Sequence, residues 1–504
     1  MNTTMNTNTT TNKTRPRPGT RAHLAIISGV FALAFSVLPM TAATLLYWDA
    51  DGDTTDAIGG TGTWALTSTI WRVGSTTGEL TAWQDDSIAV FETASNVNAN
   101  WNAKGRFAGM IFKTGTSGLN NAYEPVEFSP GATIQVDAGA TANISVKFYG
   151  SNGYTKTGSG ALNLFTGSME NFTGTVTHNG GTLQIRSADS IGTSGRLIIQ
   201  DGTSVQFYGN ADTTFGSVIP DAVTIADNGA NLAFRVGRLA NGEGVTHTFG
   251  ALSLGTRTVN LVANATTSGV SRAIFSDTTL TGNATLDIAG ATIALSLGAL
   301  SETGDTEART LTKTGTGALT LRGATNTATG NLVLKDGATT IDVDGGDTAT
   351  FDGGLELGSA GKTTTLVLDT ANVIFAEKLV VVADATIDFA ATAGANTLVF
   401  GDSSDAVWTT SGTLRIKNFD PATDILRIGV ASTGLTAGQL DKIIWVGLGE
   451  DGGDLTGGVI NERGYIAATE ALFPGLAIPE PATWAFLTAA VCAGFAVFFR
   501  RKTA

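Results

Sequence analysis

Short segments in which apolar and polar residues alternate recur along most of this 504-residue chain. Typical examples are ALNLF (161–165), TLQIR (182–186), TVNLV (258–262) and TLRIK (413–417). Each places its apolar side chains on one face and is bounded by Gly, Asn, Asp, Ser or Thr, which is the pattern of half-buried β-strands. Helical periodicity is nearly absent between Thr44 and Ala477, apart from short stretches such as TAGQLDKII (436–444). The pattern predicts an all-β protein.

Two stretches of the chain align with each other. YTKTGSGALNLF begins at Tyr154 and LTKTGTGALTLR begins at Leu311, and each is followed by a Thr-Gly pair and two more strands. The glycines suit tight corners, and the alternating leucines suit an inward-facing strand side. One such unit cannot bury its apolar face alone, whereas stacked units can. We therefore expect a right-handed parallel β-helix, or solenoid, with a β-sandwich array as the structural alternative.

These two units resemble the autotransporter-associated β-strand repeat, also called the passenger-associated transport repeat. In known families this unit builds long surface-exposed β-helices, so the resemblance implies a solenoid outside the cell. It covers the units near 154–186 and 311–342, and the second unit departs from the pattern after Arg322.

The N-terminal region has the layout of a secretory signal peptide over residues 1–43. An apolar run, Leu24–Leu38, is followed by the small residues of PMTAA, so we expect cleavage after Ala43. The cations that precede the run are Lys13, Arg15, Arg17 and Arg21. The chain is therefore predicted to be exported, with the secretion machinery as a partner.

The opposite end, residues 478–504, reads IPEPATWAFLTAAVCAGFAVFFRRKTA. Residues 482–499 carry no charge, and as a helix they would span about 27 Å at roughly 1.5 Å per residue. That length nearly matches the ~30 Å hydrocarbon core of a bilayer. The cations at 500–502 should stay on the cytoplasmic side. The pattern predicts a C-terminal transmembrane helix over 482–499, with everything before Pro479 outside.

The tail resembles the PEP-CTERM sorting signal. The residues that carry the resemblance are Pro479, Glu480, Pro481, Arg500 and Arg501. In that family an integral-membrane exosortase recognises the tail and processes the chain near the triplet. The resemblance implies an exosortase-type partner and a temporary single-pass anchor, followed by the cell surface or the extracellular matrix. Family members occur in bacteria that often make exopolysaccharide, so exopolysaccharide or other surface proteins are further expected partners.

The ends of the exported part differ from its middle. Terminal repeats must protect the open edges of a solenoid. We therefore predict a Trp-rich N-terminal cap with the first strands over 44–120, solenoid repeats over 121–400 and a C-terminal cap over 401–477. The tryptophans of the first cap are Trp48, Trp64, Trp71, Trp83 and Trp101. A carbohydrate-stacking platform at this end is the alternative.

Charge, cysteine content and histidine spacing exclude several classes of partner and chemistry. Residues 44–478 carry 23 Lys+Arg and 43 Asp+Glu, a net charge of −20, which argues against nucleic acid as a partner. The single cysteine, Cys492, lies in the apolar tail, so the exported part has no disulfide. His178 and His247 show no metal-ligand spacing, and we expect them to be surface or rung residues.

One short acidic stretch, DADGD (49–53), suggests calcium. Asp49, Asp51 and Asp53 stand at alternate positions, as at the start of a calcium loop. Position 60, where such a loop has a bidentate Glu, is Gly60. We therefore expect a solvated turn and no cofactor, with calcium as the weaker alternative.

Three functions remain open. The first is a non-catalytic protein of the cell surface or matrix, and the second is an adhesin or glycan-binding module. The third is a β-helix polysaccharide lyase or hydrolase, which would need converging carboxylates or bound calcium with a base. No catalytic motif is present, so we expect no enzyme activity. The acids that lie in polar corners are Asp201, Asp221, Asp227, Asp277 and Asp287.

Overall fold

The computed structural model describes residues 42–469 of the chain. The gaps within this range are 102–103, 121–123, 166–171, 192–195, 201–203, 216–222, 227–230, 305–306, 344–347, 370–371 and 391–394. The predicted transmembrane helix, the sorting residues and all of the signal peptide up to residue 41 lie outside the described residues.

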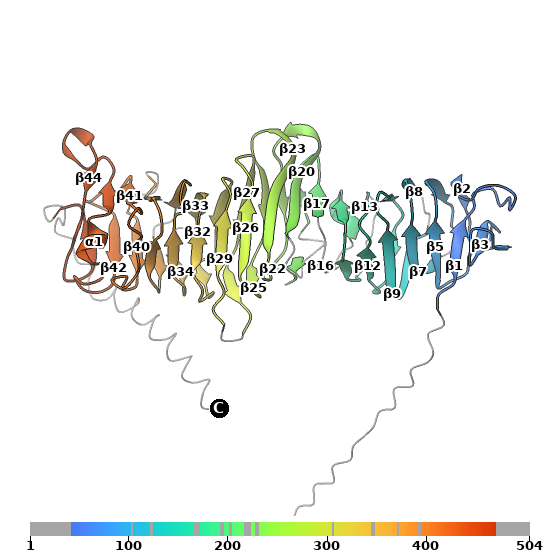
Figure 1. Ribbon diagram of the computed structural model, residues 1–504, viewed down its shortest axis with the longest axis horizontal. Coiled ribbons are helices and arrows are strands. Elements are labelled where there is room, and N and C mark those ends of the chain that lie inside the picture. The colour runs from blue at the N-terminus through green and yellow to red at the C-terminus, as the bar shows by residue number, and fades with distance from the viewer. Residues whose placement is uncertain are drawn as a thin grey trace, which may run out of the picture. The chain divides into compact units, whose positions relative to one another are not determined.

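The described residues form an all-β parallel solenoid, as the alternating pattern predicted (Figure 1). Strands of successive turns pair in parallel, for example with Leu162 opposite Leu183 and Leu295 opposite Leu319. This pairing rules out the β-sandwich alternative. Parallel pairing begins at residue 45 and continues to residue 445.

Four sheets make up the walls of the solenoid. Sheet 1 contains β1 (Leu45–Trp48), β3 (Trp71–Val73), β4 (Leu80–Thr81), β5 (Ser87–Phe91), β7 (Gly105–Phe112), β9 (Val126–Val136), β11 (Phe148–Tyr149), β12 (Tyr154–Thr157), β14 (Val176–His178), β16 (Leu197–Ile199), β19 (Val223–Ile225), β22 (Leu252–Leu254), β25 (Thr278–Leu280) and β28 (Leu300–Glu302). Sheet 2 contains β2 (Gly60–Trp64), β6 (Ser95–Ala99), β8 (Thr116–Asn120), β10 (Thr141–Ile144), β13 (Ala161–Leu164), β15 (Thr182–Ile185), β17 (Ser204–Tyr208), β20 (Leu232–Glu243), β23 (Thr258–Ser268), β26 (Ala284–Ile288), β29 (Leu311–Thr314), β32 (Leu332–Leu334), β35 (Leu355–Leu357) and β38 (Leu379–Val381).

The other two sheets belong to the middle and the C-terminal half. Sheet 3 contains β18 (Thr213–Thr214), β21 (Thr246–Thr248), β24 (Ser271–Ile274), β27 (Ile293–Leu297), β30 (Ala318–Leu321), β33 (Gly337–Ile341), β36 (Thr364–Leu368), β39 (Ala385–Asp388), β41 (Leu414–Lys417), β43 (Ile443–Trp445) and β44 (Leu455–Thr456). Sheet 4 contains β31 (Thr325–Asn326), β34 (Thr348–Phe351), β37 (Asn372–Phe375), β40 (Thr397–Phe400), β42 (Ile425–Ile428), β45 (Val459–Ile460) and β46 (Tyr465–Ala467).

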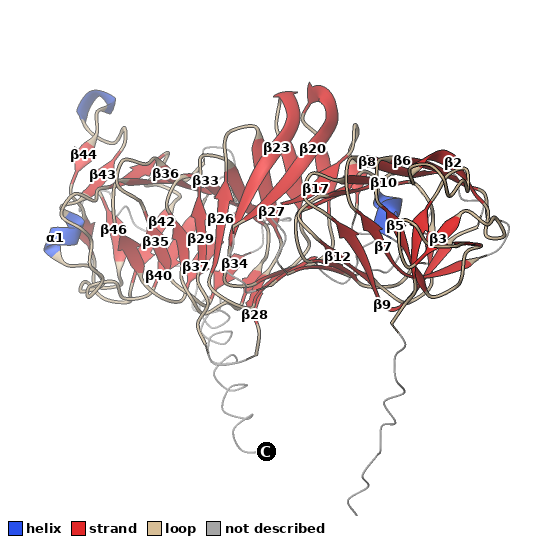
Figure 2. Ribbon diagram, turned by 45° about the vertical axis from the view of Figure 1, so that its right-hand side comes forward, coloured by secondary structure: helices blue, strands red, loops and turns tan. Residues whose placement is uncertain are grey.

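The number of strands per turn changes along the chain. From β5 to β17 the chain alternates between sheets 1 and 2, apart from the short extra strand β11 in sheet 1, and from β18 a third strand per turn builds sheet 3. After β28 sheet 1 stops, and sheet 4 begins at β31. Near the first change β20 and β23, of 12 and 11 residues, project beyond the strands beside them (Figures 1 and 2).

Strand periodicity explains the core. In β15 Leu183 and Ile185 are fully buried, whereas Thr182 and Gln184 face outward. Inward side chains of successive turns stack into one continuous hydrophobic cluster along the solenoid. Each fully buried Leu or Ile contributes about 1.5–3 kcal/mol, so the stacked interior stabilises turns that would not fold singly.

An aromatic cap closes the N-terminal end of the solenoid. All five tryptophans of this region are buried, with exposed fractions of 0–8%. Trp64 is the centre, with ring centroids 4.6 Å from Trp71, 4.8 Å from Trp101 and 5.0 Å from Trp83. The antiparallel strands β3 and β4 continue sheet 1 past β1 and cover its edge. Because these rings lie inside, they form no stacking platform for sugars.

Antiparallel strands also close the C-terminal end. β44 pairs antiparallel with β43, and β46 pairs antiparallel with β42 and β45. A short helix, α1 (Ala437–Leu440), lies within the predicted helical stretch 436–444. Thr436 caps it: its hydroxyl accepts from the Gln439 amide at 3.3 Å, and Gln439 Oε1 accepts from the Thr436 amide at 2.7 Å.

Candidate functional site

The acidic turn after β1 contains the three aspartates considered as calcium ligands. Asp49 is buried, and its Oδ2 accepts from Arg72 Nε at 2.6 Å while its Oδ1 accepts from the Gly52 amide at 3.3 Å. Asp51 Oδ1 accepts from the Asp53 amide at 3.0 Å, and this bond is the main reason that the pKa of Asp51 is lowered. Donors of the turn itself therefore engage both carboxylates.

A different aspartate completes the cluster. Carboxylate oxygens of Asp49, Asp51 and Asp56 lie within 4.8 Å of one another. Asp53 instead accepts from the Thr55 amide at 2.9 Å. The alternate spacing in the sequence did not indicate Asp56, because residues 54–56 turn the chain back toward the start of the loop.

Arg72 holds this turn together from inside. Its guanidinium is 2% exposed and donates from Nη1 to the Thr76 carbonyl at 2.7 Å. Its Nη2 donates to the carbonyls of Asp53 and Asp56, at 2.7 and 3.3 Å. The buried positive charge of Arg72 is thus bonded to the Asp49 carboxylate and to three carbonyl groups. These charge-assisted hydrogen bonds explain the conformation of the acidic turn.

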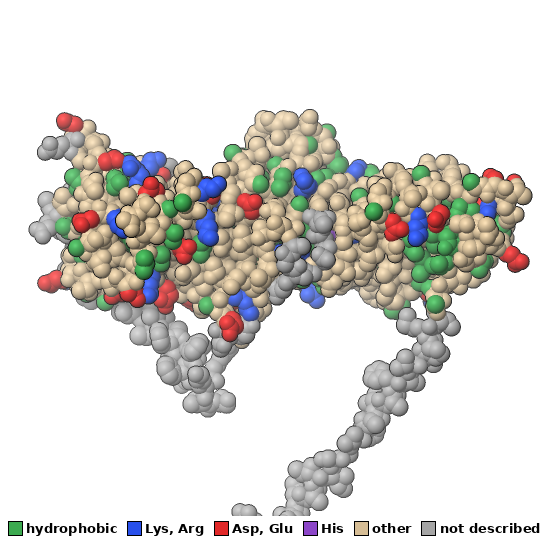
Figure 3. All heavy atoms as spheres, viewed as in Figure 1, with side chains coloured by type: hydrophobic (Ala, Val, Ile, Leu, Met, Phe, Trp, Pro, Cys, Tyr) green, Lys and Arg blue, Asp and Glu red, His purple; other side chains and the backbone are tan. Residues whose placement is uncertain are grey.

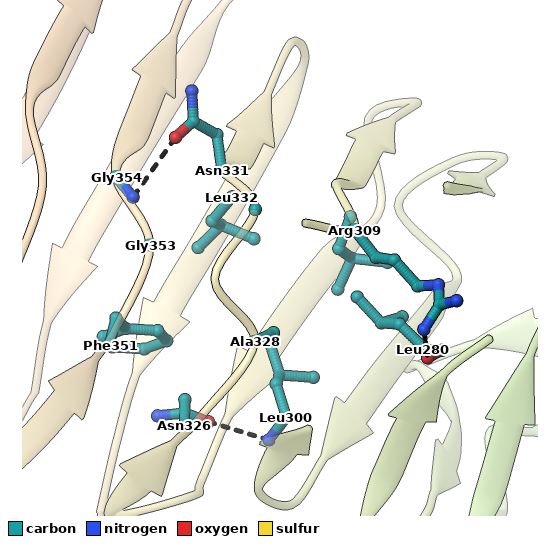
Figure 4. A pocket seen from close by; sticks show the side chains of 12 residues that line it. Leu280, Leu300, Arg309, Asn326, Ala328, Asn331, Leu332, Phe351, Gly353 and Gly354 are labelled. Carbon is teal, nitrogen blue, oxygen red and sulfur yellow. Dashed lines mark hydrogen bonds between the residues drawn. The ribbon is translucent and has the colours of Figure 1, made fainter. Parts of the chain in front are cut away.

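A small cavity lies where sheet 1 ends and sheet 4 begins (Figure 4). Its volume of about 10 Å³ is close to the minimum needed for one water molecule. The buried Asn326 spans the junction: its Oδ1 accepts from the Leu300 amide at 2.9 Å, and its Nδ2 donates to the carbonyls of Gly323 and Thr350 at 2.9 and 3.0 Å. The cavity is too small for a sugar ring.

Two carboxylates, those of Glu302 and Asp352, lie near this junction. Glu302 Oε2 accepts from the Arg309 amide at 2.9 Å, and its Oε1 accepts from the Thr329 amide and hydroxyl at 3.0 and 2.6 Å. Burial, with the charge of Glu302 second, raises the pKa of Asp352. Since backbone amides occupy both oxygens of Glu302, this group fixes the backbone at Arg309 and Thr329.

Of the remaining acids considered for catalysis, the structure describes Asp277 and Asp287. Asp277 Oδ1 accepts from the Ala299 amide at 3.3 Å, and Asp287 Oδ1 accepts from the Thr314 hydroxyl at 3.1 Å. Each thus bonds to a neighbouring turn of the solenoid. Asp201, Asp221 and Asp227 lie outside the described residues.

The repeat lysine is a buried group that the sequence analysis did not identify. Lys156 on β12 points into the solenoid and is fully buried. Its Nζ donates to the carbonyls of Gly158 and Gly160, both at 2.7 Å, and to that of Gly180 on the next turn at 2.5 Å. Burial lowers the pKa of Lys156 to about 8, and the three carbonyls favour the ammonium form at neutral pH.

The second repeat has the same arrangement. Lys313 on β29 is also fully buried, and its Nζ donates to the carbonyls of Gly315 at 2.8 Å and of Asp336, on the next turn, at 2.6 Å. Burial lowers its pKa to about 8, while the charges of Asp336 and Asp287 oppose that shift. The Lys of the TKTG unit therefore joins two successive turns. Its inward position follows from strand alternation, since it stands two residues after an inward Tyr154 or Leu311.

Both histidines are rung residues of the interior. His178 and His247 are fully buried. Their Nε2 atoms lie 3.0 Å from the Ser204 carbonyl and 3.1 Å from the Gly237 carbonyl. Burial lowers the pKa of both rings, that of His178 to about 4. Neither lies in the acidic cluster of the first turn.

The outer faces are regular and polar. On sheet 1 one half-exposed side chain per turn forms a row that is almost entirely hydroxyl. The row consists of Thr133, Thr155, Thr177, Ile198, Thr224, Ser253, Thr279 and Ser301. On sheet 2 amides bond between turns, as in Asn163 to Asn143 at 2.9 Å and Gln184 to Gln206 at 2.9 Å. Charged side chains are scattered over the face in view (Figure 3).

The chain was compared with protein-family models, curated proteins and solved structures. None of them matches it. The resemblances of the TKTG units and of the tail therefore stay predictions. Evidence about function comes from the geometry described above.

The sorting residues Pro479, Glu480, Pro481, Arg500 and Arg501 lie outside the described part of the chain, as does the predicted span 482–499. Among the described residues, no helix has the length and hydrophobicity to cross a membrane. Ala43, where we expect signal cleavage, is described and lies two residues before β1.

Proposed function

We propose that this protein is an exported, non-catalytic β-solenoid of the cell surface or extracellular matrix. The observation that carries the proposal is the outer surface. A row of hydroxyl side chains repeats once per turn on sheet 1, and amide side chains on sheet 2 bond between turns. Groups that satisfy one another along a wall do not converge on a substrate. The fourteen strands of sheet 2, at about 4.8 Å per strand, make a wall roughly 60 Å long, which suits a rigid spacer.

The other two functions receive less support. A glycan-binding module was expected to use the Trp-rich end or one face of the solenoid. The Trp-rich end offers no exposed ring, because its indole rings are buried in the cap. A polysaccharide-cleaving enzyme was expected to show clustered carboxylates in a cleft. At the junction of sheets 1 and 4 the cavity has room for about one water, and Glu302 is engaged by backbone amides.

The tail carries the sorting part of the proposal. The triplet 479–481, the uncharged segment 482–499 and the terminal arginines support recognition by an exosortase-type membrane enzyme. In this proposal the segment anchors the chain only until it is processed, and the solenoid then remains at the surface or in the matrix.

Intact mass and C-terminal peptide mapping of protein from cells and medium test the sorting step. We expect the surface form to lack the residues that follow the triplet. An intact Ala504 in the membrane fraction would make the protein a permanently anchored one and would overturn the sorting proposal.

A matched pair of variants sharpens this test. Replacing Pro479 and Pro481 by Ala should leave the tail uncleaved, whereas Pro474→Ala, a few residues upstream, should be processed normally. Equal processing of both variants would show that the triplet is not the recognised element.

A further inference from the structure

Two basic side chains lie buried side by side between turns in the N-terminal half. Lys156 on β12 and His178 on β14 occupy the same inward row on adjacent strands, directly opposite each other in the ladder. Adjacent strands are about 4.8 Å apart, so the two side chains are neighbours inside the solenoid. On its other side His178 faces Ile199 of β16, which offers no polar partner.

The corner that follows His178 connects it to the lysine. Gly180, two residues after His178, provides the carbonyl that accepts from Lys156 Nζ at 2.5 Å. The corner is tight, because a Cβ atom on Gly181 would lie 2.6 Å from that same Nζ. A displacement of His178 is therefore passed directly to the contact by which Lys156 joins two turns.

The charges that face His178 in the described residues are all positive. They are Lys156 and Arg257, and both lower the pKa of the ring in addition to the effect of burial. His247 has a different environment: it is equally buried and lies beside a carbonyl, but the charge of Asp212 favours its protonated form. The two histidines thus form a natural contrast within one chain.

We propose that His178 is an acid-sensitive trigger, and that its protonation beside Lys156 loosens the turns from β12 to β17 while the distant turns stay folded. A protonated ring places a second buried cation next to the ammonium group. The repulsion pushes the 178–181 corner away from β12 and withdraws the Gly180 carbonyl from Lys156. The carbonyls of Gly158 and Gly160 hold the ammonium only within its own turn, so the lysine no longer joins the two turns and the backbone ladder alone connects them.

The direction of the pH dependence follows from linkage. The pKa of His178 is lowered to about 4 in the folded chain, against ~6.5 for an unperturbed histidine. The unfolded segment therefore binds the proton more tightly. The stability that the neutral ring contributes is present above about pH 6.5 and is lost as the pH falls toward 4.

Hydrogen exchange of the full exported protein between pH 7.5 and 4, corrected for intrinsic rates, tests the proposal. We expect amides of β12, β14 and β15 to lose protection first, and those of β36 and β39 to stay protected. Simultaneous loss in all segments, or earlier loss at the ends of the solenoid, would overturn the proposal without any variant.

His178→Gln keeps a side-chain N–H for the Ser204 carbonyl but cannot gain a charge. We expect it to move the midpoint of local opening down by at least about one pH unit. His247→Gln is the matched control: this buried, carbonyl-bonded histidine has Thr213 and Ala273 as its ladder neighbours, and its replacement should leave that midpoint in place. An unchanged midpoint in His178→Gln, or an equal shift in His247→Gln, would contradict the assignment.

Discussion

Replacing Lys156 by methionine should destabilise the turns on either side of β12. Methionine fills a similar volume but donates no hydrogen bond, so the carbonyls of Gly158 and Gly180 lose the donor they have among the described residues. Gly160 O keeps one partner, because it also accepts from the Thr182 amide at 3.2 Å. The substitution thus removes three contacts and leaves two carbonyls unsatisfied.

The expected change in the free energy of unfolding of Lys156→Met is the sum of two opposing contributions. A buried carbonyl without a partner costs about 1–3 kcal/mol, so two of them cost about 2–6 kcal/mol. Removing the ammonium also relieves the desolvation of a buried charge, which offsets part of that loss. We expect a net destabilisation of about 2–4 kcal/mol, confined to the neighbouring turns because a solenoid is stabilised by contacts between nearest neighbours.

Native-state hydrogen exchange in rising urea measures this effect turn by turn. Lys147→Met is the matched control, since Lys147 is exposed and its loss should change stability by no more than about 0.5 kcal/mol. Lys313→Met should reproduce the effect around β29. If Lys156→Met and Lys147→Met change exchange near β12 equally, the carbonyl contacts do not stabilise the fold and the reasoning fails.

Three further predictions concern the caps and corners. Trp64→Ala should cost about 3–5 kcal/mol in denaturant unfolding, because Trp64 is the centre of the N-terminal cap. Arg72→Met should cost about 3–5 kcal/mol by leaving Asp49 buried without its partner, and added calcium should not restore the loss. Gly298→Ala should unfold its corner, because the new Cβ would meet a backbone oxygen at 1.4 Å, whereas Gly438→Ala, with open space around it, should be tolerated.

For each of these three predictions, one experimental result would contradict it. Unfolding of Trp64→Ala within 1 kcal/mol of the parent, roughly the effect of an ordinary substitution, would mean that the cap adds little. Recovery of Arg72→Met by calcium would show that the acidic turn binds the ion. Equal melting of the two glycine variants would show that the corner at residue 298 can relax.

The strands could be predicted from the sequence because burial in a strand has a period of two. Segments such as TLQI place every second residue inside, and the structure follows that order. Corners were also predictable where glycine is needed: Gly158 and Gly180 have φ of 76° and 132°, which other residues rarely adopt. The number of sheets was not predictable, because it depends on the direction in which the chain leaves each corner.

The positions of several buried or clustered polar side chains could not be predicted from the sequence. The lysine of the TKTG unit was given no role from the sequence, although its place in the alternation puts it inside the solenoid. Asp56 was missed because it joins Asp49 and Asp51 through a turn of the backbone. The histidines were expected at the surface or in rungs, and only the three-dimensional register places His178 opposite Lys156.

The two lysines also explain why the same repeat unit can occur at corners between different pairs of sheets. Lys156 precedes the corner from sheet 1 to sheet 2, whereas Lys313 precedes the corner from sheet 2 to sheet 3. The same residues therefore build a corner, and the wall on which that corner lies is set by the preceding turns. Because the ammonium bonds to its own corner and to the next turn, the unit fixes the stacking of two turns locally. A chain that changes from two strands per turn to three can use it on both sides of the change.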